Sequence, residues 1–235
     1  MKLLWITLLI FGSALVAAEP GATVDARKTP DSDNPKLPRV MLIGDSISVG
    51  YTDGVRAELA GKANVYRVQG NAGPSSSGVQ QVDAWIASGN GHWDVIHFNF
   101  GLHDLKLSTG GKDNKSYPTA DGHQVSQDEY ERNLRLIVTK LKRTGAKLIW
   151  CSTTPIPKGK LDPLRRPGDE VIYNQVALNV MIENEVLIDD IYTFALTRIT
   201  EIQQPANVHF TKEGSALLAK HVAASIQAAL QARSP

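Results

Sequence analysis

The sequence predicts an α/β fold, in which a five-stranded parallel sheet is covered by helices on both faces to give a three-layer α/β/α sandwich. Five short apolar segments of strand length alternate with segments whose apolar residues recur every three or four positions. Strands separated by helices pair in parallel through right-handed crossovers, which place helices on both faces of the sheet. The hydrophobic content of 42% in 235 residues suits one packed core.

The elements can be assigned in chain order. The predicted strands are Val40–Ile43, Val65–Val68, Val95–Phe100, Lys147–Cys151 and Val186–Ile188. Helical periodicity lies between them, at Val55 and Leu59, at Val79, Val82 and Ile86, from Leu134 to Leu141, and from Val171 to Ile182. Ser126 and Glu129 form a capping box that predicts the start of the third helix, and Gly145 predicts its end. A last helix is expected after His209.

Residues 1–18 have the pattern of a signal peptide. Lys2 gives a positive start, Leu3 to Val16 is almost continuously apolar, and small residues precede the expected cleavage site near Ala18. The apolar run is shorter than the ~20 residues that span a bilayer, which argues against an uncleaved anchor. We therefore expect an exported mature chain, periplasmic or secreted, without stable membrane insertion.

The rest of the chain divides into two parts. Residues 19–38 hold four prolines and no apolar periodicity, which predicts a linker or an N-terminal arm. Residues 39–235 are expected to form one domain. Within this domain, residues 106–125 and 157–169 are long for simple connections, so we expect both loops to shape a substrate site.

Charge and motif content exclude several classes of function. The formal net charge of +1 provides no basic field, so nucleic acid is not an expected partner. The single cysteine, Cys151, excludes an internal disulfide and a cysteine-based zinc site. The chain also lacks a His-Glu-x-x-His motif and both glycine-rich nucleotide-binding motifs, so neither a metal nor a cofactor is expected.

Polar motifs follow the predicted strands, where ligands bind in folds of this class. After the first strand, Gly44-Asp45-Ser46 places a serine at a strand-to-helix turn, either as a nucleophile or as a plain helix cap. After the second strand, Gly73 in Asn71-Ala72-Gly73-Pro74 lets its backbone N–H approach a ligand closely. Gly101-Leu102-His103-Asp104 follows the third strand, and His209 precedes the last helix.

In this combination and order, the four segments resemble the marker blocks of the SGNH (GDSL-type) hydrolase superfamily, from about residue 38 to residue 230. The resemblance implies a flavodoxin-like SGNH-hydrolase fold and a serine esterase. It makes Ser46 the nucleophile and an oxyanion donor through its N–H, Gly73 a second N–H donor, and His209 the general base. Asp45, Asp104 and Asn207 are expected to support these groups.

Two positions depart from the family pattern. His103 stands where the family has an asparagine; its imidazole N–H could fill the same oxyanion hole, or it could be a structural histidine held by Asp104. Ala206 stands where the family usually has the aspartate that orients the general base. Asn207, a backbone carbonyl near residues 204–206, or a carboxylate such as Asp190 or Glu213 could take that role.

These observations together predict a metal-independent serine ester hydrolase. Export and long polar loops favour an acylated, most simply acetylated, carbohydrate; the loop residues concerned are Asp113, Lys115, Tyr117, His123, Lys158, Arg165 and Arg166. The alternatives are a lipase or lysophospholipase, a sulfate-ester hydrolase if His103 is cationic, and a sugar-binding protein that has lost catalysis. His97 and His221 are expected to be interior or half-buried side chains.

Overall fold

Five parallel strands form the central sheet, in the order β2-β1-β3-β4-β5. Their bounds are β1 (Arg39–Ile43), β2 (Asn64–Arg67), β3 (Val95–Phe98), β4 (Lys147–Cys151) and β5 (Leu187–Asp189). The computed structural model describes residues 34–108, 117, 119 and 121–232. The predicted signal peptide, most of the predicted arm, and Asp113 and Lys115 lie outside the described residues.

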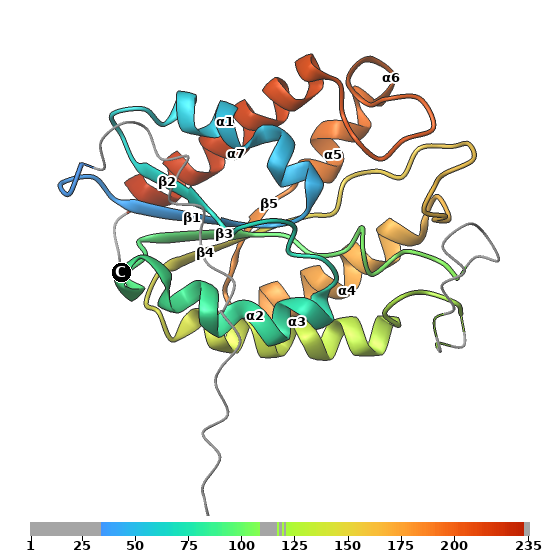
Figure 1. Cartoon of the computed structure of the whole chain (residues 1–235), viewed down its shortest axis with the longest axis horizontal. Helices are drawn as coiled ribbons and strands as arrows, with labels where there is room; N and C mark the ends of the chain where they lie inside the picture. Colours follow the sequence, from blue (N-terminus) through green and yellow to red (C-terminus); the bar gives the residue numbers. More distant parts are fainter. Residues whose placement is uncertain (1–33, 109–116, 118, 120, 233–235) are drawn as a thin grey trace, which may run out of the picture.

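Helices cover both faces of this sheet (Figure 1). One face carries α1 (Ser46–Glu58), α7 (Lys212–Gln231) and the short α5 (Ile191–Leu196), while the other carries α2 (Ser75–Ala87), α3 (Gln127–Lys142) and α4 (Asp169–Glu183). A four-residue helix, α6 (Ile199–Ile202), precedes the loop that leads to α7, and a 3₁₀ turn, η2 (Ser88–Gly91), follows α2. The predicted three-layer α/β/α class and the five parallel strands are thereby confirmed.

The strands are buried on both faces, as expected for a parallel sheet under two helical layers. Val40, Met41 and Leu42 of β1 are fully buried, and Trp85, Trp93 and Trp150 are among the largest fully buried side chains of the core. Ser126 caps α3 by accepting a hydrogen bond from the Glu129 backbone N–H, as the capping box predicts. None of the helices in the described part of the chain is long and apolar enough to span a membrane.

The structure corrects some element bounds and adds elements that the sequence did not predict. β3 ends at Phe98 instead of Phe100. The Asn99 N–H still donates to the Ile43 carbonyl at 2.9 Å, but the Phe100 carbonyl accepts from side chains, the Tyr130 hydroxyl at 2.7 Å and the Thr153 hydroxyl at 3.1 Å. β5 is shifted by one residue, to Leu187–Asp189. The short α5, α6 and η2 contain too few turns to give a periodic apolar signal.

Strand order fixes where a ligand would bind. The chain leaves β1 for β2 on one side and then returns to β3 on the other side of β1, so the connections diverge between β1 and β3. Such a switch point opens a crevice at the carboxyl ends of the strands. Ser46 follows β1 and His103 follows β3, so both lie at this crevice.

Candidate active site

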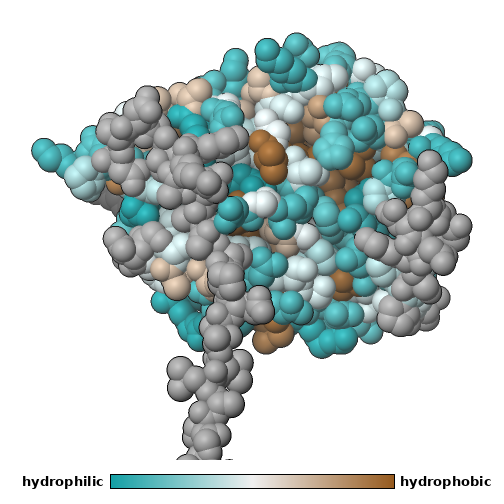
Figure 2. All heavy atoms as spheres, in the orientation of Figure 1, coloured by the Kyte–Doolittle hydropathy of each residue, from teal (hydrophilic) through white to brown (hydrophobic). Residues whose placement is uncertain are grey.

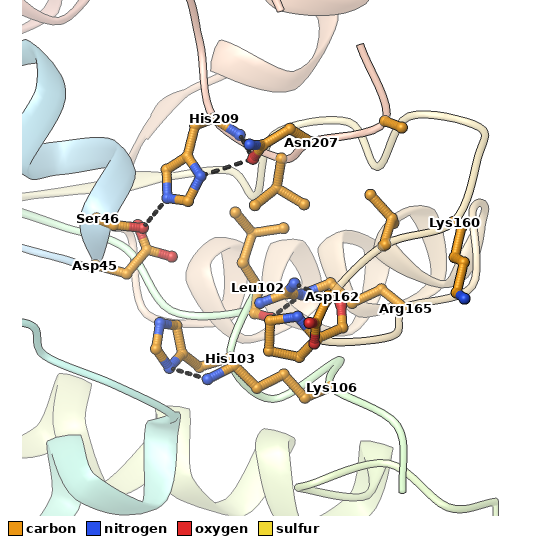
Figure 3. A pocket seen from close by; sticks show the side chains of 14 residues that line it. Asp45, Ser46, Leu102, His103, Lys106, Lys160, Asp162, Arg165, Asn207 and His209 are labelled. Atoms are coloured by element: carbon orange, nitrogen blue, oxygen red, sulfur yellow. Dashed lines mark hydrogen bonds between the residues drawn. The ribbon is translucent and has the colours of Figure 1, made fainter. Parts of the chain in front are cut away.

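Ser46 is the first residue of α1, and its side chain reaches His209 across the crevice. The Ser46 Oγ lies 2.8 Å from the His209 Nε2 (Figure 3). The helix cap is Asp45, whose Oδ1 accepts from the Ile47 backbone N–H at 2.9 Å. The alternative of Ser46 as the plain cap is therefore wrong, and its hydroxyl is left to the imidazole.

His209 lies in the loop between α6 and α7, and Asn207 holds its ring. The His209 Nδ1 is 2.7 Å from the Asn207 Oδ1, which also accepts from the His209 backbone N–H at 3.0 Å. The Asn207 amide nitrogen donates to the Gln204 Oε1 at 3.2 Å, which turns the amide oxygen toward the ring. Because an amide oxygen only accepts, His209 Nδ1 carries the proton and Nε2 is left as the acceptor.

Neither of the two carboxylates considered for orienting His209 is shown in contact with its ring, and one of the candidate carbonyls has another partner. Asp190 is the N-cap of α5, where its Oδ1 accepts from the Thr193 backbone N–H at 3.1 Å. The Gln204 carbonyl accepts from the Asn207 backbone N–H, and Glu213 lies exposed in the first turn of α7. Of the groups that the sequence left open as partners of the His209 ring, Asn207 is the one that contacts it.

The backbone N–H groups of Ser46 and Gly73 were expected to face an oxyanion, and they differ in their hydrogen bonding. Ser46 lies in the first turn of α1, where a backbone N–H has no acceptor within the helix. Gly73 adopts a left-handed conformation with φ +70°, and its N–H donates to the Asn71 Oδ1 at 2.8 Å. The Gly73 N–H would have to exchange this partner before it could bind an oxyanion.

His103 lies on the wall of the crevice below Ser46 in Figure 3. Its Nδ1 is 3.0 Å from the Lys106 Nζ, so the ring is held by Lys106 and not by Asp104. Burial, followed by the charges of Lys106, Arg165 and His209, lowers the pKa of His103 to about 3. The imidazole is therefore neutral near pH 7.

Asp104 joins the loop after β3 to the start of α2. Its Oδ1 accepts from the Ser75 backbone N–H at 2.9 Å and from the Ser75 hydroxyl at 2.5 Å, and Asn133 donates to the same hydroxyl at 3.0 Å. Complete burial raises the pKa of Asp104 to about 7. Burial likewise raises the pKa of Asp45 above its usual value.

Arg67 is a supporting residue that the motif analysis missed. It is buried at the end of β2, and its guanidinium donates to the carbonyls of Gly44 (3.0 Å), Asp45 (3.2 Å), Val68 (2.7 Å) and Gly70 (2.6 Å). Its Nε also donates to the Ser48 hydroxyl at 3.1 Å. Arg67 thereby joins the Ser46 turn to the loop that carries Gly73. An arginine inside an otherwise apolar strand is the sequence signal that could have identified it.

A cavity of about 350 Å³ opens beside Ser46 and His209. The 157–169 loop supplies much of its wall, through Lys160, Leu161, Asp162, Pro163 and Arg165. The Arg165 guanidinium donates to the Leu102 carbonyl at 2.6 Å, which anchors this loop to the turn that carries His103.

The remaining loop residues named above lie outside this wall wherever the structure describes them. His123 lies between Asp121 and Asp169, with one ring nitrogen 2.7 Å from each carboxylate, and so ties the 106–125 loop to α4. Lys158, Arg166 and Tyr117 do not line the cavity. The 157–169 loop thus shapes the cavity through a different set of side chains, and the 106–125 loop contributes Lys106.

Among the described residues, one group of three side chains has the donor types of a metal site, namely His97, Cys151 and Asp189. All three are buried and none lines the cavity. Both Asp189 oxygens already face imidazoles, since His97 Nε2 and His221 Nε2 each lie 2.8 Å away. Burial raises the pKa of Asp189, but hydrogen bonds from His221 and His97 outweigh this effect and bring the pKa below its usual value. His97 is interior and His221 half-buried, as expected.

No family model and no curated protein sequence matches this chain. Solved structures do match it. A lipase/acylhydrolase from Enterococcus faecalis has a TM-score of 0.65 at 19% identity, over 85% of this chain and 100% of that one. The acetyl xylan esterase AlAXEase has a TM-score of 0.62 at 17% identity, over 80% and 99% of the two chains. Axe2, an acetylxylan esterase from Geobacillus stearothermophilus, has a TM-score of 0.57 at 20% identity, over 80% and 94%.

These neighbours define the class of fold. The chain shares the fold of these esterases and acylhydrolases, which confirms the SGNH-hydrolase-like fold that the resemblance implies. At identities of 16–21%, the likeness concerns the fold. What the site does is argued from its own geometry below.

Proposed function

We propose that this protein is a serine ester hydrolase whose nucleophile is Ser46. The observation that carries the proposal is the continuous hydrogen-bonded series from the Ser46 hydroxyl through the His209 ring to the Asn207 amide oxygen, with distances of 2.8 and 2.7 Å. Each group has the protonation that the reaction requires. His209 Nε2 is an acceptor facing the hydroxyl, and Nδ1–H is held by an oxygen.

In the proposed reaction, the Ser46 Oγ attacks the ester carbonyl carbon while its proton moves to the His209 Nε2. The carbonyl oxygen becomes an oxyanion, and collapse of the tetrahedral intermediate expels the alcohol, which takes the proton from His209. Water then attacks the acyl-serine with His209 again acting as base, which releases the acid and restores Ser46.

The oxyanion is stabilised by N–H groups at the end of the crevice. The Ser46 N–H is one donor and the His103 Nε2–H is another, in place of the family's asparagine. Gly73 would contribute a third donor after its N–H leaves the Asn71 side chain.

The substrate we propose is an acetylated carbohydrate. Most side chains that line the cavity are polar or charged, including Lys160, Asp162 and Arg165 on the 157–169 loop, and these can hydrogen-bond sugar hydroxyls. A volume of about 350 Å³ suits a short acyl group and one or two sugar units. Two of the neighbours described above are acetyl xylan esterases, which agrees with this choice.

The alternative functions receive less support. A lipase needs a long apolar trough, whereas nine of the fourteen residues that line this cavity are polar or charged. On the face drawn in Figure 2, hydrophobic and hydrophilic residues lie side by side. Sulfate-ester hydrolysis was considered for a cationic His103, but the low pKa of His103 leaves that ring neutral. A binding protein without catalysis has no need for a serine hydroxyl aligned with an imidazole.

We further propose that the protein acts outside the cytoplasm after cleavage near Ala18, on the basis of the N-terminal sequence pattern. Its partner would then be an extracytoplasmic acylated glycan, and neither nucleic acid nor a membrane is part of the proposal. The length of the mature chain, measured by mass spectrometry on exported material, tests this part independently of the chemistry.

The proposed activity is tested with a fluorophosphonate probe and a panel of acetylated and sulfated glycans. The parent protein should be labelled at Ser46 and should release acetate. Ser46→Ala should show neither reaction, although its unfolding temperature should equal that of the parent. Ser215→Ala is a matched control, because Ser215 lies on α7 and does not line this cavity. Wild-type acetate release by folded Ser46→Ala would disprove the assignment.

A further inference from the structure

Lys106 and His103 meet within one turn after β3. The Leu105 N–H donates to the Gly101 carbonyl at 3.0 Å and the Lys106 N–H to the His103 carbonyl at 3.3 Å, so the backbone folds the lysine back over the ring. The Lys106 Nζ then lies 3.0 Å from the His103 Nδ1 (Figure 3). Gly101 permits this turn, since a Cβ built there would lie 1.9 Å from the Thr153 Oγ1.

The chemistry of this contact fixes the tautomer of His103. A protonated lysine has three N–H donors and no acceptor, so the ring nitrogen that faces it must offer a lone pair. That nitrogen is Nδ1, and in a neutral imidazole the proton is then on Nε2. Nε2 makes no hydrogen bond among the described residues and lies on the side of the ring toward Ser46 in Figure 3.

The same reasoning gives His209 the opposite tautomer. There an amide oxygen faces Nδ1, so Nδ1 carries the proton and Nε2 accepts. The two histidines of this crevice are thus held as opposite tautomers, because a hydrogen-bond acceptor faces the Nδ1 atom of one and a donor faces the Nδ1 atom of the other. One is suited to accept the Ser46 proton, and the other is suited to donate to an oxyanion.

We propose that Lys106 is a positioning residue that holds His103 as the neutral Nε2–H tautomer, so that this imidazole donates to the oxyanion where the SGNH pattern has an asparagine amide. The proposal rests on the proposed esterase function. It extends that function by accounting for how a histidine, which has two tautomers, can replace an amide, which has a fixed donor.

The charges around the ring agree with a neutral donor. Burial is the largest of the causes that lower the pKa of His103. The charges of Lys106 in the same turn and of Arg165 on the 157–169 loop act in the same direction, as does His209 once it is protonated. A lysine hydrogen bond to Nδ1 also withdraws electron density from the ring, which makes Nε2–H a stronger donor.

The kinetic test uses Lys106→Met in two backgrounds. In the parent, this change should lower kcat by at least about tenfold with little effect on KM, because one weakened oxyanion donor acts on the transition state. Lys106→Arg, which also only donates, should recover part of the loss. In the His103→Asn background, the amide needs no partner to fix its donor, so Lys106→Met should change kcat by less than about twofold. Lys220→Met is the control and should have no effect, because Lys220 is an exposed residue of α7.

A spectroscopic test reports on the tautomer without requiring turnover. In a long-range ¹H–¹⁵N spectrum of the full chain, the His103 ring, assigned by its loss in His103→Asn, should show a protonated Nε2 and a bare Nδ1 from pH 5 to pH 9. Lys106→Met should give a mixture of tautomers. An equal loss of kcat in both backgrounds, or an Nδ1–H tautomer in the parent, would overturn the proposal. Absence of probe labelling at Ser46 would instead overturn the esterase function and leave the tautomer result standing.

Discussion

At the scale of single residues, the site is defined by which atom faces each imidazole. Asn207 presents an oxygen to His209, and Lys106 presents an ammonium to His103. The two histidines of the site are therefore in different hydrogen-bonding states. An uncharged amide contacts the proposed base, His209, at the point where the SGNH pattern usually provides a carboxylate. In the proposed mechanism, the imidazolium that forms as Ser46 attacks would therefore have a weaker electrostatic partner.

This makes Asn207 a position where catalysis can be both lost and gained. Asn207→Ala should lower kcat by about 10²-fold, because nothing then fixes the His209 tautomer. Asn207→Asp should keep or raise kcat, and it should move the acidic limb of the kcat/KM profile to higher pH, because a nearby carboxylate raises the pKa of the base that must be neutral.

Rate profiles from pH 4 to pH 9 with an acetate ester check both expectations for Asn207. Asn179→Asp, on the exposed side of α4, introduces the same charge away from the site and should leave the profile unchanged. An unaltered profile in Asn207→Asp would mean that another group orients His209.

At the scale of elements, the loops after β1, β2 and β3 are joined by buried polar side chains. Arg67 connects the Ser46 turn to the loop after β2, and Asp104 connects the loop after β3 to the start of α2. Because the proposed oxyanion donors and the proposed nucleophile come from separate loops, their relative positions depend on these contacts. Each contact can be tested by a conservative substitution.

Arg67→Lys keeps the positive charge but cannot span the carbonyls that the guanidinium joins. We expect a loss of about 2–4 kcal/mol in the free energy of unfolding, since several buried carbonyls lose a charged donor, and a fall in kcat in the protein that remains folded. Urea unfolding measures the first effect. Turnover measured without urea, at a temperature below the thermal unfolding transition, measures the second. Arg135→Lys, a surface arginine paired with Glu131 and Glu183, should change neither. Full stability and activity in Arg67→Lys would contradict a positioning role.

Asp104 should make stability depend on pH. Its pKa is raised from 3.8 to about 7 by burial, so the folded state favours the neutral acid. The contribution of Asp104 to stability is therefore complete below about pH 4 and is lost as pH rises through about 7, at roughly 1.4 kcal/mol for each unit of pKa difference.

Comparison with Asp104→Asn isolates this titration. The difference in unfolding free energy between the parent and Asp104→Asn should change by a few kcal/mol between pH 5 and pH 8. The parent should become less stable relative to Asp104→Asn as the pH rises. Asp53→Asn, an exposed partner of Arg56, serves as the control. A pH-independent difference for Asp104→Asn would show that Asp104 is ionised in the folded protein throughout this range.

At the scale of the whole molecule, the sheet order brings groups from distant parts of the chain to one crevice. Ser46 and His209 are 163 positions apart in sequence, and their contact depends on α1 and α7 packing side by side on one face of the sheet (Figure 1). The cavity wall comes from a third region, the 157–169 loop.

The groups in the proposed reaction are a hydroxyl, two imidazoles, an amide oxygen and backbone N–H groups, so chelation is expected to have no effect on turnover. Acetate release by protein dialysed against EDTA should equal that of untreated protein, and adding back zinc or magnesium should not increase it. Loss of activity on dialysis that a single divalent ion restores would contradict the serine mechanism as proposed.

The sequence by itself determined the α/β class, the five strands and the main helices, because these depend on local periodicity and capping signals such as Ser126 with Glu129. It also identified Ser46, His103 and His209 as candidates for chemistry, since their motifs directly follow strands or precede a helix. Only the tertiary structure decided how these side chains are held. The lysine on His103, the amide on His209, the internal hydrogen bond of Gly73 and the carbonyls gathered by Arg67 are matters of direction and distance between loops. A hydrogen bond selects partners within about 3 Å and a narrow range of angles, which a pattern of residue types along one chain does not specify.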